Sequence, residues 1–404
     1  MLFVAQLIGN AGLLVSVLIV ARALGPDGRG TTAFVLVTAQ VVAAVASFGL
    51  PQASSILVAE QSRRGTLLTN LIVFQLAAAT ATALVVCATL LVAGEQRPKG
   101  VGTSEILILG AATVANGLFH ASEQFLLGSG RLLQRGTVIA VWPWTYVAVL
   151  LSLVLLIGLD VPAVIGAWTV CHGVAALWLL GTAARAAGLG RLDFELLMRA
   201  LRFGGRLWPG NLAFFLNFRV DQILMGFITT QATLGIYAVA VNASETLLYL
   251  PSAVASALLP LITRSAPRER HERTLRAFRS LLIPSTATVL AAAALGPIVI
   301  PVVFGTAFAA SVGPFLLLLP GTMGYVVSSV FSSSLLGASR PGLSSLAAIT
   351  SLVVGVGLDL ALIPAFGAEG AAVAASGAFV AGGFVAILAY RQHIREVVSR
   401  GQML

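Results

Sequence analysis

The sequence predicts an all-α polytopic membrane protein with about twelve transmembrane helices, and two observations support this. Of its 404 residues, 58% are hydrophobic and only 10% are charged, and the mean hydropathy is +0.97. Soluble globular domains do not have this composition. Apolar stretches of about twenty residues recur along the chain, each long enough to cross a bilayer core of about 30 Å as a helix. We therefore expect the membrane region to comprise the whole chain.

Charged residues, prolines and glycine-rich breaks delimit the predicted spans. The spans are placed at 2–21, 31–51, 66–94, 104–127, 136–158, 162–183, 207–228, 233–262, 276–303, 311–337, 341–363 and 368–390. The ninth span contains Pro284, Pro297 and Pro301. Because each proline removes a backbone hydrogen bond, we expect this helix to be bent or broken.

The basic residues sort between alternate loops and so predict an orientation. One set of loops holds most of them: Arg63, Arg64, Arg131, Arg135, the segments 185–206 and 264–279, Arg340, Arg391, Arg395 and Arg400. The other set holds Arg22, Arg29, Arg97 and Lys99. Cytoplasmic loops are richer in basic residues, so we expect the first set and both termini in the cytoplasm. Since Lys99 is the only lysine, the composition suggests a GC-rich bacterial genome and hence a bacterial cytoplasmic membrane.

A basic amphipathic segment divides the chain near its middle. Its apolar residues can share one helical face: Leu192, Leu196, Leu197, Met198 and Leu201. This pattern predicts an N-terminal six-helix bundle at 1–184, a cytoplasmic amphipathic linker at 185–206 and a C-terminal six-helix bundle at 207–404.

Several function classes are disfavoured by the sequence. The net charge is +9, but the basic residues are dispersed among short loops, which argues against nucleic-acid binding. The sequence has no phosphate-binding loop of the Gly-x-x-x-x-Gly-Lys type, no paired Asp-x-Asp and no His-x-x-x-His. We therefore expect no direct use of ATP, no cofactor, no metal and no enzymatic activity.

Two groups of motifs, one at the start of each half, carry a family resemblance. The first is ARALGPDGRG at 21–30, followed by a helix that ends in FGLP at 48–51. The second comprises RFG at 202–204, Asn211, NFRVDQILMG at 217–226 and LGIYAVA at 234–240. Together they resemble the polysaccharide biosynthesis flippases of the multidrug/oligosaccharidyl-lipid/polysaccharide exporter superfamily. The resemblance implies two six-helix bundles around a central cavity, lined mostly by the first two helices of each half, and transport by alternating access.

Polar side chains within the spans predict which residues line a cavity. An Arg or Asp at mid-bilayer costs about 2.5–3.5 kcal/mol on insertion scales, so each should face a cavity or a partner. The candidates belong to the first, second, seventh and eighth spans: Gln6, Asn10, Gln40, Asn211, Asn217, Arg219, Asp221, Gln222, Asn242 and Glu245. These are the spans that the family resemblance places around its cavity.

Three arginines are each open to two interpretations. Arg219 either contacts the diphosphate of a polyprenyl carrier or forms an inter-helix ion pair, for example with Glu245. Arg22 and Arg29 lie at the predicted outer mouth, where substrate contact and ordinary solvation both explain them. Asp359, near the outer end of its span, could reach interfacial water.

The fourth span carries a stripe of Asn116, His120 and Glu123. The His-Glu pair is either a proton relay or a buried hydrogen-bonded pair. The candidates for a coupling ion or proton site are Asp221, Glu245, Glu123 and His120. His172 in the sixth span is isolated, and we expect it to be a packing histidine with satisfied hydrogen bonds.

The expected function is translocation of a polyprenyl-diphosphate-linked saccharide from the inner to the outer leaflet. The expected partners are this lipid-linked saccharide, membrane lipids, and a glycan polymerase or glycosyltransferases. Three alternatives remain: a cation-coupled multidrug exporter of the same superfamily, a lipid II flippase, and a non-transporting scaffold for glycan assembly. The drug exporter would favour acidic residues in the first helix, where this sequence has Gln6 and Asn10.

Overall fold

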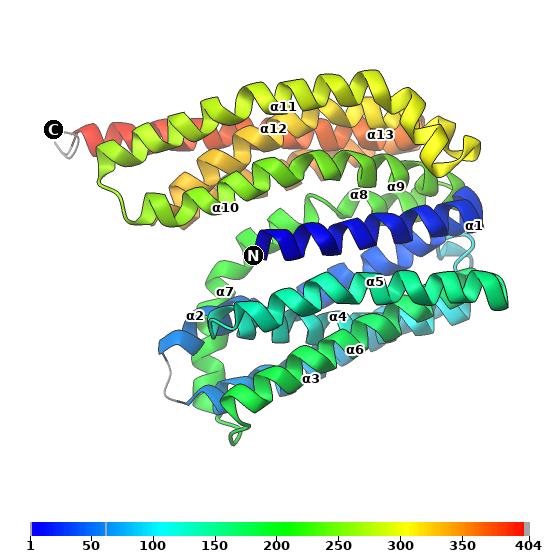
Figure 1. The fold of residues 1–404 in the computed structure, drawn as a ribbon, viewed down its shortest axis with the longest axis horizontal. Coiled ribbons are helices and arrows are strands. Elements are labelled where there is room, and N and C mark those ends of the chain that lie inside the picture. The colour runs from blue at the N-terminus through cyan, green and yellow to red at the C-terminus, as the bar shows by residue number, and fades with distance from the viewer. Residues whose placement is uncertain (1, 61–62, 400–404) are drawn as a thin grey trace. The chain divides into compact units, whose positions relative to one another are not determined.

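The computed structural model confirms an all-α membrane protein. It describes residues 2–60 and 63–399, and the long elements within these ranges are all helices (Figure 1). In this part of the chain, nine helical stretches are long and apolar enough to cross a membrane. The contacts divide the chain into two compact units, Met1–Leu212 and Ala213–Leu404.

The first unit is built from seven helices. They are α1 (Leu2–Ala46), α2 (Leu50–Glu60), α3 (Arg64–Val92), α4 (Thr103–Gly128), α5 (Leu132–Leu156), α6 (Val161–Ala187) and α7 (Phe194–Leu216), with a 3-10 turn η1 (Gly94–Gln96) after α3. The last residues of α7 belong to the second unit.

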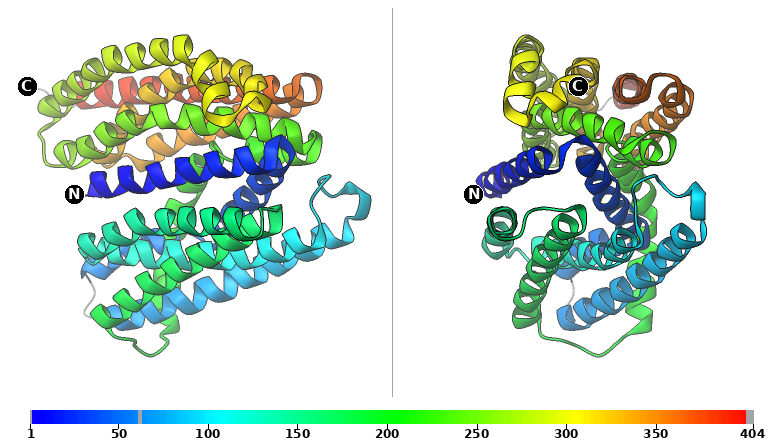
Figure 2. Two further views of the ribbon diagram at one scale, coloured as in Figure 1. Left: turned by 45° about the vertical axis from the view of Figure 1, so that its right-hand side comes forward. Right: turned by 90° about the vertical axis from the view of Figure 1, so that its right-hand side faces the viewer.

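The second unit continues with six helices. They are α8 (Val220–Ile228), α9 (Gln231–Glu245), α10 (Tyr249–Thr263), α11 (Pro267–Phe304), α12 (Val312–Gly337) and α13 (Pro341–Ser399), with 3-10 turns η2 (Thr246–Leu248) and η3 (Thr306–Ser311). Helix α12 packs against both α11 and α13, as Figures 1 and 2 show from different directions.

Two of the long helices contain a glycine break and therefore hold two spans each. In α1 the break is at Gly25, with φ of 65° and ψ of −171°, and in α13 it is at Gly367, with φ of 55° and ψ of −124°. Glycine adopts such positive φ values without a steric penalty. The predicted spans at 2–21 and 31–51 therefore lie on the two sides of Gly25, and those at 341–363 and 368–390 lie on the two sides of Gly367.

The seventh predicted span, 207–228, is wrong as a single helix because α7 ends at Leu216 and α8 begins at Val220. At this break the Phe218 N–H bonds the Phe215 carbonyl at 3.2 Å, a tighter turn than in an α-helix. The side chain of Asn217 donates to the Ala213 carbonyl at 2.8 Å and so competes with the helical pattern.

The ninth predicted span is not broken, because α11 runs as one helix through Pro284, Pro297 and Pro301. A bend at these prolines stays a prediction. Membrane helices tolerate proline where hydroxyl side chains and neighbouring helices satisfy the freed backbone groups. In the following turn, the Thr288 hydroxyl donates to the Pro284 carbonyl at 2.7 Å.

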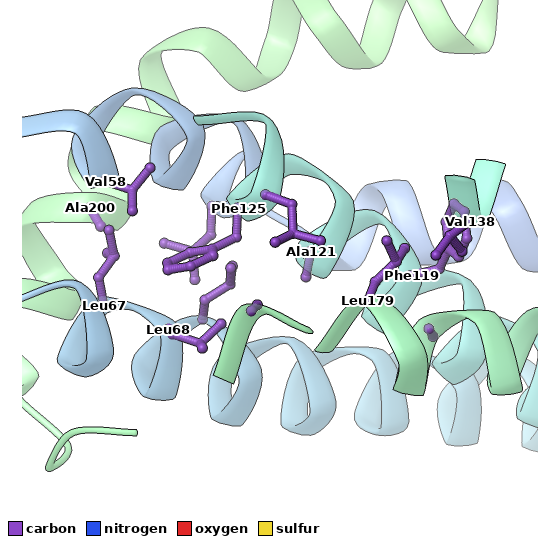
Figure 3. Close-up of a cluster of buried hydrophobic side chains, with 14 of the residues drawn as sticks. Val58, Leu67, Leu68, Phe119, Ala121, Phe125, Val138, Leu179 and Ala200 are labelled. Atoms are coloured by element: carbon purple, nitrogen blue, oxygen red, sulfur yellow. The ribbon is translucent and has the colours of Figure 1, made fainter. Parts of the chain in front are cut away.

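A cluster of buried apolar side chains fixes α4 within the first unit (Figure 3). Phe125 of α4 is fully buried together with Leu67 and Leu68 of α3 and Leu179 of α6. Because such interiors are close-packed, this cluster sets the rotation of α4 about its axis. It thereby determines where the polar stripe of α4 points.

The segment before α7 is held to α3 by a reciprocal pair of hydrogen bonds. Asn70 donates from Nδ2 to the Asp193 carbonyl at 2.7 Å, and the Asp193 N–H donates to Asn70 Oδ1 at 3.0 Å. Asn70 is buried, so the pair satisfies a polar group that hydrocarbon would leave unpaired. The start of α7 is therefore anchored on the first unit.

A backbone contact between two glycines brings α7 against the turn before α2. A Cβ atom added at Gly204 would lie 2.6 Å from the Gly49 carbonyl oxygen, whereas one added at the neighbouring Gly205 would meet nothing within 4 Å. The nearest atoms belong to the backbone of Gly49 and Leu50, so no flexible side chain could move aside for the added Cβ. Both glycines of this contact belong to the motifs identified in the sequence, which gives those motifs a packing role.

We expect Gly204→Ala to lower the free energy of unfolding by about 1–3 kcal/mol through overpacking. Gly205→Ala is the matched control and should be neutral or stabilising by up to about 1 kcal/mol, because alanine favours a helix. Thermal unfolding of the purified protein in detergent measures both. Equal melting temperatures for the two variants would contradict the close contact.

Candidate functional site

A cavity of about 280 Å³ in the first unit is lined by α1, α4, α5 and α6. Five residues of the predicted site lie on its wall: Gln6, Asn10, Gln40, His120 and Glu123. Gln6 and Asn10 come from α1 before the glycine break, and Gln40 comes from α1 after it. The break in α1 therefore lets one helix contribute two walls of the same cavity.

Amide side chains form the polar part of this wall. Gln6 donates from Nε2 to Asn10 Oδ1 at 3.0 Å, and Asn116 of α4 is buried beside the cavity at 3% exposure. Each amide has a carbonyl oxygen and two N–H donors, so a single mutual hydrogen bond leaves most of its capacity free. The wall can therefore bind a ligand that both donates and accepts hydrogen bonds.

The one carboxylate that the described residues place on the cavity wall, Glu123, is already paired. Glu123 accepts a hydrogen bond from the Arg135 guanidinium, and its second oxygen lies 3.3 Å from His120 Nδ1. Glu123 is buried at 8% exposure, whereas the His120 side chain is 53% exposed. The geometry brings His120 and Glu123 together as the sequence spacing indicated, and Arg135 balances the charge of Glu123. A proton relay through this pair stays a prediction.

Four aromatic rings on the cavity wall were missed in the sequence analysis as site residues. His172 stacks on Trp168 with ring centroids 4.3 Å apart and an interplanar angle of 11°, and Trp142 meets it edge-on at 4.7 Å. Phe119 lies 4.3 Å from His172 on another side. Both ring nitrogens of His172 are buried without a hydrogen-bond partner in the described part of the chain, so the expected satisfied histidine is wrong.

In the second unit, the helix break after α7 places Arg219 beside α9. Its Nη1 atom donates to Glu245 Oε1 at 2.6 Å and to the Phe218 carbonyl at 2.9 Å. The second contact satisfies a backbone oxygen at the break. The structure thus contains the inter-helix ion pair that the sequence left open, and contact between Arg219 and a substrate stays a prediction.

Two aspartates lie buried near each other in the same unit. Asp221 is 5% exposed and accepts hydrogen bonds from the Tyr237 hydroxyl and, at 2.7 Å, from the Gln222 N–H. Asp359 of α13 is 1% exposed, lies within electrostatic range of Asp221, and has an Oδ1 atom without a partner in the described residues. The expectation that Asp359 reaches interfacial water is therefore wrong, because its side chain is buried inside the unit.

A small cavity of about 30 Å³ adjoins Asp221 and is also lined by Asn217, Tyr237 and Glu245. A space of this size has room for a water molecule or a small ion. Asn217 also donates to the Ala348 carbonyl of α13 at 2.9 Å, which ties the helix break to the helix that carries Asp359. The arrangement can hold a small charged species next to two carboxylates.

The remaining predicted site residues lie away from both cavities. Asn242 donates to the Ala238 carbonyl of its own helix at 2.5 Å, and Gln222 is buried at 3% exposure. Asn211 and Arg22 are exposed. Arg29 is buried at 7% exposure, so the interpretation of it as a solvated loop charge is wrong. It lies in α1, four residues after the break at Gly25.

Comparison with known proteins supports the family resemblance. Residues 1–266 match the family described as polysaccharide biosynthesis protein. The chain is 23% identical to the probable low-salt glycan biosynthesis flippase of Haloferax volcanii over 94% of this chain and 79% of the relative. Among solved structures, it is similar to the lipid II flippase MurJ in an inward closed conformation, with a TM-score of 0.75, 15% identity, and coverage of 96% of this chain and 87% of that one. It is also similar to an inward-facing multidrug resistance MATE family transporter of the MOP superfamily, with a TM-score of 0.74, 14% identity, and coverage of 98% and 99%.

A double-mutant cycle separates the structural role of the Arg219–Glu245 pair from any other role. We expect Arg219→Met alone to destabilise the protein by about 3 kcal/mol, because it leaves Glu245 without its partner. The double variant Arg219→Met/Glu245→Leu should recover most of this loss, since it removes both charges. Thermal unfolding in detergent provides the measurement. The single variant Glu245→Leu completes the cycle. If the losses of the two single variants add up to the loss of the double variant, the pair contributes no coupling energy.

Proposed function

Because this chain belongs to the polysaccharide biosynthesis protein family, we propose that it translocates a polyprenyl-diphosphate-linked saccharide from the inner to the outer leaflet of the membrane. The protein binds the headgroup and exposes it alternately on the two sides, while the polyprenyl tail stays in lipid. The chain acts as a transporter and catalyses no covalent step.

The observation that carries this proposal is the chemistry of the 280 Å³ cavity in the first unit. Sugars present hydroxyl groups that donate and accept hydrogen bonds, which matches the amides of Gln6, Asn10 and Gln40. Small-molecule sites combine aromatic surface with a few polar groups that fix orientation, and Trp142 and Trp168 supply that surface. Among the described residues of the wall, Glu123 is the only carboxylate and Arg135 neutralises it, so the cavity suits an uncharged saccharide better than a cationic drug.

Arg219 is the proposed contact for the diphosphate. A guanidinium binds carboxylates and phosphates through the same bidentate geometry. The diphosphate can therefore take the place that the Glu245 carboxylate now occupies on Arg219. Glu245 would then need a proton or another cation, which links substrate binding to the coupling ion.

The coupling site is proposed at Asp221 and Asp359. Two buried carboxylates are costly unless a proton or a cation compensates them, and the described hydrogen bonds to this pair come from Tyr237 and one backbone N–H. The 30 Å³ cavity beside Asp221 offers room for such an ion. Glu123 and His120 form a second candidate for proton transfer in the first unit.

The distribution of basic residues supports an orientation with both termini in the cytoplasm. The excess of arginine over lysine supports a bacterial cytoplasmic membrane. Enzymes that extend or transfer the glycan are the proposed functional partners on the two sides of the membrane.

The proposal predicts flipping in liposomes that contain a fluorescent polyprenyl-diphosphate oligosaccharide. Exposure of the label to a membrane-impermeant quencher should be fast with the wild type and at least tenfold slower with Trp168→Ala, which removes a stacking surface. Trp178→Ala on the same helix is the matched control, because Trp178 is 48% exposed and lies outside the cavity. Arg219→Ala should slow flipping as well, and Arg97→Ala should not.

Two results would overturn this function. If the label is quenched no faster than in empty liposomes with several headgroups, the protein is a drug exporter or a scaffold. If flipping is fast but Trp168→Ala and Trp178→Ala behave alike, the saccharide does not use this cavity. Insertion and melting temperature of each variant are measured alongside, so that unfolding is recognised.

The coupling site predicts a selective loss of ion dependence. In the same liposomes, an imposed proton or sodium gradient should accelerate flipping by the wild type, and Asp221→Asn or Asp359→Asn should abolish that acceleration. Asp27→Asn is the control, because Asp27 is an exposed carboxylate on α1. Gradient-dependent rates that survive both substitutions would place the coupling ion elsewhere.

A further inference from the structure

Five helix ends converge at one end of the second unit around a pocket of about 190 Å³. The pocket lies where α10 and α12 end, where α11 and α13 begin, and where α13 finishes. In Figure 1 the connection from α10 to α11 and the last turns of α13 are found at this same end of the unit. None of the lining residues belongs to the two cavities described above.

Two arginines, one histidine, one tyrosine and one carboxylate are among the described residues that line this pocket. Arg270 donates from Nε to the Ser265 carbonyl at 2.6 Å, and Arg340 donates from Nη2 to Glu396 Oε2 at 2.8 Å. His393 is 9% exposed, and its Nδ1 atom has no hydrogen-bond partner in the described residues. His393 also lies within electrostatic range of Arg270, Arg340 and Glu396.

The charges in the pocket do not cancel. Glu396 balances Arg340, which leaves the charge of Arg270 in excess even when His393 is neutral. A charge in a partly enclosed site is favourable only if an opposite charge or several hydrogen bonds compensate it. The pocket therefore has the electrostatics of a site for a ligand with one negative charge, and His393 Nδ1 adds a hydrogen-bonding group that is not yet used.

The residues around the pocket indicate that the anion is the headgroup of a membrane lipid. Apolar side chains such as Ile262, Ile394 and Val397 share the wall with the charged groups. Helix α11 adds further arginines over its first four turns: Arg276 and Arg279, and also Arg268 and Arg273, which are paired with Glu272 and Glu269. Basic pockets between membrane helices, near a cluster of arginines at the interface, are typical of sites for anionic lipid headgroups.

We propose that this pocket binds the phosphodiester headgroup of an anionic phospholipid, with Arg270 and His393 contacting the phosphate and the apolar wall contacting the glycerol and upper acyl chain. A phosphodiester carries a single negative charge, which matches the excess of one positive charge. This site is independent of the transported substrate and does not rest on the proposed function.

The test is titration of the purified full-length protein in a non-ionic detergent with phosphatidylglycerol, followed by native mass spectrometry. We expect one lipid retained per protein. Phosphatidylcholine with the same acyl chains should bind at least tenfold more weakly. Inorganic phosphate at millimolar concentration should not displace the lipid, because it lacks the glycerol and acyl contacts.

Variants localise the binding. Arg270→Gln should weaken phosphatidylglycerol binding about tenfold, the loss expected when a charge-assisted hydrogen bond is removed. Arg270→Lys should recover part of it. Ala338→Leu should weaken binding without changing the charge, because Ala338 lines the pocket and the larger side chain fills it. Arg276→Gln is the matched control, since it removes an exposed arginine of the same helix outside the pocket and should change affinity less than twofold.

Three outcomes would overturn the proposal. Equal binding of phosphatidylcholine would show that the headgroup is not recognised. Displacement by inorganic phosphate would identify a general phosphate site. Equal losses with Arg270→Gln and Arg276→Gln would mean that only the overall surface charge attracts the lipid. Melting temperatures in lipid-free detergent identify any variant that fails to fold, and Arg270→Lys then remains the informative comparison.

Discussion

Polar groups that this chain buries among its apolar helices are costly unless they find partners within the protein, because hydrocarbon offers none. Side-chain contacts between different segments meet this requirement, among them those of Arg219 with Glu245, Tyr237 with Asp221, and Arg135 with Glu123. Each contact joins segments that are separated in sequence, so satisfying the polar groups also fixes which helices pack together. The helices cannot rotate about their axes without breaking these contacts, and the cavities keep their walls for the same reason.

This constraint explains how much of the site the sequence could predict. Gln6, Asn10, Gln40, His120 and Glu123 were selected because a polar side chain in a span needs a cavity or a partner, and all five line one cavity. The aromatic residues of that cavity carry no such cost. A tryptophan is stable on a lipid-facing surface as well as in a site, so Trp142 and Trp168 could not be distinguished from Trp178 by composition.

The fold was predicted where a local signal exists and missed where the signal is tertiary. The length of the apolar stretches predicts the spans, and a glycine followed by a proline predicts the break in α1. The break between α7 and α8 contains neither residue type, and it depends on Asn217, which bonds both its own helix and α13. The burial of Asp359 likewise depends on the neighbours of α13, which a pattern along one helix does not contain.

The two units surround their cavities with different kinds of polar group, and the difference bears on mechanism. The first unit surrounds its larger cavity with amides and rings, so the free hydrogen-bonding capacity of the wall is neutral. The second unit buries paired charges beside a cavity that is much smaller. Neutral amides discriminate ligands by hydrogen-bond geometry, whereas a buried ion pair responds to the arrival of another charge.

An ion pair is also the kind of contact that a charged ligand can exchange at little net cost. Removing one partner of a buried pair is expensive, but replacing that partner by another anion keeps the guanidinium satisfied. At Arg219 the exchange leaves Glu245 as the group that must be compensated, and Glu245 lines the same small cavity as Asp221. An anion at Arg219 would therefore leave the negative charges of Glu245 and Asp221 close together without the guanidinium. A proton or cation could then compensate them.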